Sequence, residues 1–207
     1  QKLNEYSSQI TWYMNHSVER FEEHNDEVRI FGSHQNQKFD ACFDGLLIAN
    51  GARSQLRPKA WVKVDKAYPW GAAWSIVPEC QVLDSEILHQ FYDRSKIMMG
   101  ILPTGAIPTE PQQRLSSVFW SLPTPQLQSF LQDEQAKQAW LKQVSERWPK
   151  VAEWLKEILY NSQTQPKWLS ANYRDVVMTQ FGQSRIGVIG DAAHAMSPQL
   201  GQDRKST

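Results

Sequence analysis

Hydrophobic and polar residues alternate along residues 10–49 in a way that predicts a series of short β-strands. The clearest case is 27–31 (EVRIF), where Val28 and Ile30 fall on one face and alternate with Glu27 and Arg29. The dipeptide Asn25-Asp26 before it is typical of a turn. Similar patterns of apolar residues predict further strands at 10–13, 17–21 and 39–43.

Two short apolar runs, 46–49 and 185–189, each lead into a turn that contains glycine. The first run (LLIA) is apolar at every position and is followed by Asn50-Gly51. A short run that is apolar on both faces is typical of a strand buried between two layers, as in parallel α/β sheets. The second run ends in Gly190-Asp191. The two runs therefore predict two strands of an α/β sheet.

The middle of the chain has a different pattern. Strands are predicted at 70–77, 97–102 and 115–121, separated by loops rich in proline and glycine, which favours a mainly antiparallel sheet. Residues 124–160 are predicted to be helical, with Pro149 at the first turn of a new helix. The apolar side chains that recur at helical spacing after it are expected to pack against the sheet: Val151, Trp154, Leu155, Ile158 and Leu159.

These patterns predict an α/β fold. Taken as a whole, the chain would be classed as α+β. Residues 1–66 and 182–207 are expected to belong to one α/β domain, and 67–181 to a second domain made of the antiparallel sheet and the helices. The chain starts at a glutamine inside patterned sequence and ends in a polar tail after Gln202. We therefore expect both ends to be truncated or altered.

The composition is that of an ordinary soluble globular protein. Hydrophobic residues make up 41% of the 207 residues, and 22 basic residues balance 22 acidic ones. Without a basic excess a nucleic-acid partner is not expected, and no apolar run is long enough to predict a transmembrane segment. Cys42 and Cys80 form no CxxC motif and are expected to be reduced thiols of a cytoplasmic protein.

The turn at Gly190 and Asp191 is a candidate ligand site. Open α/β sheets bind ligands at the carboxyl ends of their strands, and glycine lets a ligand approach the backbone there. The Asp191 carboxylate could accept hydrogen bonds from sugar hydroxyls. Pro198 would shape the loop into the next helix, and Gly201 and Gln202 would lie near its N-terminus, where free amides suit an electron-rich acceptor.

The segment RIGVIGDAAHAMSPQLGQ resembles the second FAD-binding motif of the class A flavin monooxygenases, the p-hydroxybenzoate hydroxylase-like family. That motif is a GDAAH followed by a proline and GQG, and Asp203 stands here where its last glycine is expected. The resemblance implies that the aspartate binds the ribityl or ribose region of FAD and that the proline and GQ lie against the flavin ring. The cofactor-binding residues that it implies here are Gly190, Asp191, Ala193, Pro198, Gly201 and Gln202.

The segment FDGLLIANGARSQLR resembles the middle motif of the same family, which serves both FAD and the pyridine nucleotide. Its matching positions are Asp44, Leu46, Leu47, Ala49, Gly51, Ser54 and Arg57. The resemblance implies that Arg57 lies near the FAD pyrophosphate, for which its guanidinium offers a bidentate cation. Asn50 stands where the family motif has an aspartate. The asparagine keeps an acceptor oxygen but lacks the negative charge.

Together the two motifs imply an FAD-dependent monooxygenase that uses NAD(P)H and O₂ on an aromatic or similar apolar small molecule. The fold they imply is part of a p-hydroxybenzoate hydroxylase-like FAD-binding domain, with the antiparallel sheet and helices inserted as a substrate domain. Trp74, Met99 and Pro103 are the candidates for lining the substrate pocket. We name no catalytic base, and the oligomeric state is left open.

Two other interpretations remain. The same scaffold could serve a reductase or a halogenase, although we find no lysine-bearing halogenase motif. The chain could also be a fragment that binds FAD poorly, because none of its ten glycines forms the G-x-G of the ADP-binding unit, whose natural place is before Gln1. No metal site is expected, since the histidines His16, His24, His34 and His89 have no metal-ligand spacing.

Overall fold

The computed structural model describes residues 2–94, 97–107, 110–161 and 166–196. They form two compact units, each with its own hydrophobic core. The first unit is the described part of Gln1–Lys66 together with Asp175–Ala195, and the second is the described part of Ala67–Arg174 together with Met196. The divisions fall within the strands β5 (Val62–Pro78) and β9 (Leu169–Met178).

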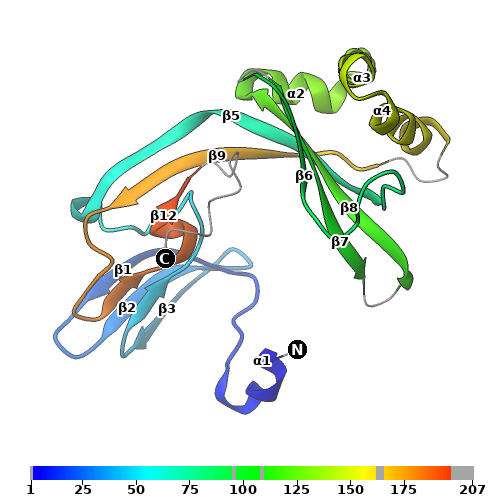
Figure 1. Cartoon of the computed structure of the whole chain (residues 1–207). Coiled ribbons are helices and arrows are strands. Elements are labelled where there is room, and N and C mark those ends of the chain that lie inside the picture. The colour runs from blue at the N-terminus through cyan, green and yellow to red at the C-terminus, as the bar shows by residue number, and fades with distance from the viewer. Residues whose placement is uncertain (1, 95–96, 108–109, 162–165, 197–207) are drawn as a thin grey trace. The chain divides into compact units, whose positions relative to one another are not determined.

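The first unit contains a three-stranded antiparallel sheet in the order β1-β2-β3, drawn in blue in Figure 1. Its strands contain the segments predicted at 17–21 and 39–43, and all of the segment predicted at 27–31 except Glu27. Gln35 and Asn36 join β2 to β3, and both have a positive φ, as in the turns whose twist suits a hairpin. The bounds of the strands are β1 (His16–Glu23), β2 (Val28–His34) and β3 (Gln37–Phe43).

The strand predicted at 10–13 is wrong, because these residues pair with no described strand. The side chains of Trp12 and Tyr13 are each 60% exposed, so no sheet face covers them. Before them the chain forms a short helix, α1 (Lys2–Glu5), and one turn of 3-10 helix, η1 (Ser7–Gln9).

A second small sheet of the first unit has the order β10-β11-β4. It consists of β10 (Gly182–Gln183), β11 (Ile186–Val188) and β4 (Leu46–Ile48), and β11 and β4 are parallel. Ile48 and Val188 are 2% and 1% exposed and belong to the core, whereas Leu47 is 69% exposed. The prediction of a strand buried on both faces is therefore wrong at Leu47, since the described residues cover only the face of β4 that carries Ile48.

In the second unit, the strands of the main sheet follow the order β9-β5-β8-β7-β6, and β8 forms antiparallel pairs with β5 and β7. The antiparallel sheet predicted for the middle of the chain is confirmed. Its strands β7 and β8 are longer than expected, and β12 (His194–Ala195) pairs with β9 at Val176 and Val177, in the first unit. The remaining bounds are β6 (His89–Asp93), β7 (Ile97–Ile107) and β8 (Glu110–Pro123).

Helices cover one face of this sheet (Figure 1). Asp133 caps the second of them by accepting a hydrogen bond from the Gln135 amide at 2.8 Å, and Pro149 begins the third, as predicted. Their apolar side chains pack with alternate residues of the strands, among them Val118 and Trp120. No helix among the described residues is long and apolar enough to cross a membrane. The helices are α2 (Thr124–Gln132), α3 (Glu134–Arg147), α4 (Pro149–Lys156) and the π-helical turn η3 (Glu157–Asn161).

Candidate functional site

The parallel pair β4 and β11 brings the two sequence motifs together. Leu46 pairs with Ile186 and Ile48 with Val188, so both strands end at the same level. The Ile189 amide donates to the Ile48 carbonyl oxygen at 3.0 Å and extends the pairing by one residue. The turns that follow, at Gly51 and Gly190, therefore lie at one edge of the sheet, the edge where open α/β sheets bind ligands.

Both turns have a glycine in the left-handed region of backbone conformation. Gly51 has a φ of 84° and Gly190 a φ of 57°, and among the described residues, the two chain neighbours aside, no atom lies within 4 Å of the position that a Cβ would occupy at either glycine. The backbone conformation, and not crowding, therefore favours glycine here. The open space lets a ligand approach the main chain at both turns. Gly190 begins η4 (Gly190–Ala192), closed by a hydrogen bond from the Ala193 amide to the Gly190 carbonyl at 2.9 Å.

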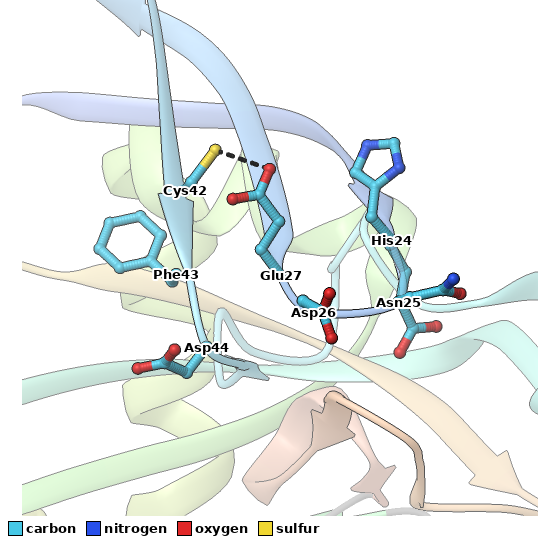
Figure 2. A pocket seen from close by; sticks show the side chains of 8 residues that line it. His24, Asn25, Asp26, Glu27, Cys42, Phe43 and Asp44 are labelled. Atoms are coloured by element: carbon cyan, nitrogen blue, oxygen red, sulfur yellow. Dashed lines mark hydrogen bonds between the residues drawn. The ribbon is translucent and has the colours of Figure 1, made fainter.

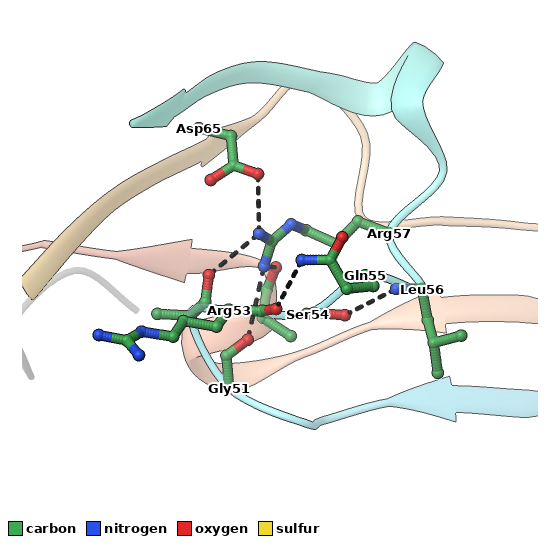
Figure 3. A network of polar contacts seen from close by, with 9 residues as sticks. Gly51, Arg53, Ser54, Gln55, Leu56, Arg57 and Asp65 are labelled. Carbon is green, nitrogen blue, oxygen red and sulfur yellow. Dashed lines mark hydrogen bonds and ion pairs between the residues drawn. The ribbon is translucent and has the colours of Figure 1, made fainter. Parts of the chain in front are cut away.

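Arg57 connects the two turns (Figure 3). Its Nη1 donates to the carbonyl oxygen of Ala192 at 3.1 Å and to that of Gly51 at 3.5 Å. Its Nη2 donates to the carbonyl oxygen of Ala52 and to the Asp65 carboxylate, both at 3.0 Å. The Arg57 side chain is only 3% exposed, and Asp65 balances its charge. One guanidinium thus holds both motif loops and the start of β5.

This geometry changes the interpretation of Arg57. Its two terminal nitrogens bond to protein oxygens, and its Nε is buried without a hydrogen-bond partner among the described residues. A buried guanidinium engaged in this way positions the loops that carry Gly51 and Gly190. Direct contact with a pyrophosphate stays a prediction, and it would require these bonds to rearrange.

The other predicted cofactor residues lie in different settings. Asn50 and Asp191 are exposed at the same edge, with their polar side chains open to solvent. Ala193 is 4% exposed and its side chain is part of the core, so it packs the turn against the core of the first unit. The predicted residues Pro198, Gly201 and Gln202 lie outside the described residues.

A cavity of about 250 Å³ lies in the second unit, on the sheet face opposite to the helices. Trp74 lines it, as do Met98, Phe119 and Tyr173, together with the smaller residues Ala72, Ser117 and Ala171. Met99 does not line it, because strand alternation directs its fully buried side chain into the core beneath the helices. Pro103 is not among the lining residues either. Sequence reasoning missed Phe119 and Tyr173 and preferred Met99 to its neighbour Met98, since apolar composition does not tell which alternate residues of a strand face the cavity.

A larger, open cavity of about 880 Å³ lies in the first unit, around the β1–β2 turn and the end of β3 (Figure 2). Four carboxylates line it, those of Glu23, Asp26, Glu27 and Asp44, together with His24 and Cys42. The Cys42 thiol donates to Glu27 Oε1 at 3.2 Å, and this hydrogen bond raises the pKa of Cys42 above its ordinary value. The thiol is therefore held in its neutral, poorly nucleophilic form. The described residues contain no cluster of three or more acidic, histidine or cysteine side chains able to hold a metal ion.

No family model and no curated protein matches this sequence. Solved structures do match it. CmlS, a flavin-dependent halogenase, matches with a TM-score of 0.68 and 17% identity over 97% of this chain and 35% of its own. The p-nitrophenol 4-monooxygenase PnpA from Pseudomonas putida DLL-E4 matches with a TM-score of 0.57 and 17% identity over 90% of this chain and 43% of its own. Aklavinone-11 hydroxylase, solved with FAD and aklavinone, matches with a TM-score of 0.56 and 12% identity over 91% of this chain and 34% of its own.

The chain thus spans between about a third and two fifths of the length of these three structures. The similarity lies in the fold, since fewer than one residue in five is identical. The predicted fold class is confirmed: the chain is a mixed α/β protein with mainly antiparallel sheets and helices, and it has the fold of a portion of flavin-dependent monooxygenases and halogenases.

Proposed function

We infer that this protein is an FAD-dependent monooxygenase that uses NAD(P)H and O₂ to hydroxylate an aromatic or similar apolar small molecule. The observation that carries this proposal is the parallel register of β4 and β11. It brings the two glycine turns of the FAD-like motifs to one sheet edge, although about 140 residues separate them in the sequence. Either motif alone could be an ordinary turn, and their convergence at a ligand-binding edge is what favours a cofactor site.

The residues at this edge fit FAD. The unfilled space beside Gly51 and Gly190 leaves room for a cofactor against the main chain, and the exposed Asp191 carboxylate can accept hydrogen bonds from ribityl or ribose hydroxyls. Arg57 holds the two loops at a fixed separation, and Asn50 offers a neutral polar side chain. FAD, when bound, supplies the redox chemistry, and the protein's part is to orient it and exclude water.

The cavity lined by Trp74 is the proposed substrate pocket. Three aromatic rings and Met98 suit an apolar, planar molecule, and about 250 Å³ accommodates one or two rings. The hydroxyl groups of Ser117 and Tyr173 provide polar atoms that could fix the orientation of a substituent. In this proposal 67–181 is the substrate-binding domain, and 1–66 with 182–207 belongs to the FAD-binding domain.

Halogenation is the second candidate. It is favoured by the similarity to CmlS, a flavin-dependent halogenase whose fold aligns over 97% of this chain. We find no lysine-bearing halogenase motif within these 207 residues, which span 35% of the length of CmlS. Product analysis in the presence and absence of chloride and bromide separates the two reactions, because only a halogenase gives a halide-dependent product.

The proposal is tested on the protein expressed from its complete gene. We expect the purified protein to contain FAD and to consume O₂ with NADH or NADPH, faster when a small aromatic compound is added. A protein that never binds flavin would refute the proposal. Flavin-dependent NAD(P)H oxidation that neither consumes O₂ nor responds to aromatic compounds would instead indicate a reductase. For the 207-residue chain itself, we expect FAD titration to show weak binding.

A further inference from the structure

Two histidines that are far apart in the sequence meet at one end of the first sheet. His16 begins β1 and His34 ends β2, and the antiparallel register makes them direct cross-strand neighbours. Their imidazole rings are stacked, with centroids 4.1 Å apart and planes 17° from parallel. Phe39 and Tyr13 form edge-to-face pairs with His16, with ring centroids 4.9 Å and 5.6 Å from that of His16. The pair is therefore ordered by its neighbours.

Backbone contacts fix which nitrogen of each ring carries the proton. His16 Nδ1 lies 2.9 Å from the carbonyl oxygen of Met14, and His34 Nδ1 lies 3.2 Å from that of Asn15. A carbonyl oxygen can only accept, so in the neutral rings both protons are on Nδ1. Both Nε2 atoms then carry a free lone pair. Among the described residues, neither Nε2 has a hydrogen-bond partner.

This arrangement has features of a two-histidine metal-binding site. A metal-ligating histidine commonly donates its other ring N–H to a backbone carbonyl, which fixes the tautomer and raises the basicity of the ligating nitrogen. Both histidines already do so. Zinc binds imidazole nitrogen at about 2.0–2.1 Å. The two rings have centroids 4.1 Å apart, so both Nε2 atoms can reach one ion when the two side chains tilt out of the stack until their in-plane lone pairs converge.

We propose that His16 and His34 bind one divalent transition-metal ion through their Nε2 atoms, with water completing the coordination. Imidazole ligands suit Zn²⁺, Ni²⁺ and Cu²⁺ and discriminate against Mg²⁺ and Ca²⁺, which prefer oxygen. The bound ion would cross-link the start of β1 to the end of β2. This site is separate from the proposed flavin site and does not depend on it.

The test is a calorimetric titration of Zn²⁺ into the 207-residue chain, with Mg²⁺ as the metal control. We expect one Zn²⁺ per chain, no response to Mg²⁺, and affinity reduced at least about tenfold by His16→Gln and by His34→Gln alike. His24→Gln is the matched control, because His24 is an exposed histidine just after β1, and it should bind Zn²⁺ like the wild type.

A second measurement keeps the test independent of folding. In ¹⁵N spectra of the wild-type imidazoles, Zn²⁺ should shift the Nε2 resonances of His16 and His34 and leave those of His24 and His89 in place. The proposal is overturned if the wild type shows no stoichiometric Zn²⁺ binding, if either variant binds as tightly as the wild type, or if other histidines shift instead.

Discussion

At the scale of single residues, Arg57 joins the parts of the candidate site through several hydrogen bonds. Its guanidinium hydrogen-bonds to carbonyl oxygens of both motif loops and to Asp65. The sequence identifies Arg57 through its motif but not its partners, because Ala192 is 135 positions away and a backbone carbonyl has no sequence signature. The role that motif matching assigns to a residue can therefore differ from the contacts that the fold gives it.

Replacing Arg57 by methionine should destabilise the chain by about 3 kcal/mol, because it removes charge-assisted hydrogen bonds and leaves Asp65 without its buried partner. Arg57→Lys should recover only part of this loss, since an ammonium lacks the fork that reaches several oxygens at once. The measurement is the free energy of unfolding in urea. Arg53→Met, at an exposed neighbouring arginine, is the control and should change it by less than about 0.5 kcal/mol. Equal effects of the Arg53 and Arg57 variants would contradict the role of Arg57.

Cys42 gives a prediction about pH. Its hydrogen bond to Glu27 raises its pKa, so at pH 8 less of the thiol is ionised than in an unperturbed cysteine. Glu27→Gln removes the carboxylate charge and should lower the pKa of Cys42, which moves the pH profile of alkylation to lower pH and speeds the reaction at pH 8. The measurement is the rate of iodoacetamide labelling against pH in a Cys80→Ala background. An unchanged midpoint would show that Glu27 does not control this thiol.

At the scale of elements, the sequence predicts which segments are strands better than which face of each strand is buried. The strands at 27–31 and 46–49 follow from apolar patterning, yet Leu47 is exposed and Ile48 is buried. The sequence does not decide between Met98 and Met99 as the residue that lines the cavity for the same reason, since neighbouring residues point to opposite faces and both are apolar. Which face is covered depends on register and on the helices, and neither can be inferred from a run of apolar residues alone.

The two methionines give a paired test of this assignment. Met99→Ala should cost about 2–5 kcal/mol of unfolding free energy, because the side chain is fully buried beneath the helices. Met98→Ala should cost clearly less and should instead weaken the binding of small aromatic compounds to the cavity that Met98 lines. Urea denaturation measures the first effect and tryptophan fluorescence the second. The reverse order of stabilities would mean that the faces of β7 are assigned the wrong way round.

At the scale of the whole molecule, the sequence predicts the fold class and the order of the parts. The mixed α/β fold class and the antiparallel sheet followed by helices are confirmed, because each rests on a periodicity that a local segment can reveal, and the two apolar runs at 46–49 and 185–189 form the parallel pair β4 and β11. The division into compact units differs from the domain boundaries at 181 and 182, since β9 continues to Met178 and its last residues belong to the first unit. Long strands that cross a division carry no composition change, so sequence alone does not mark the boundary.

The proposed flavin site lies in the first unit and the proposed substrate cavity in the second. We therefore expect single substitutions to disable each of them separately. In the protein from the complete gene, Gly190→Val should lower the flavin content, because a β-branched residue is strained at a φ of 57° and its side chain would occupy the space left for the cofactor. Trp74→Ala should leave flavin content unchanged and weaken binding of small aromatic compounds, since Trp74 lines the cavity of the second unit.

Gly105→Val is the matched control for Gly190→Val, because Gly105 has a φ of 79° and open space around it but lies in the second unit. It imposes similar backbone strain and should leave flavin content near that of the wild type. Flavin absorbance per protein and fluorescence titration are the two measurements. If the Gly105 variant loses flavin as completely as the Gly190 variant, the loss comes from strain in general, and the turn at Gly190 has no special part in holding the cofactor.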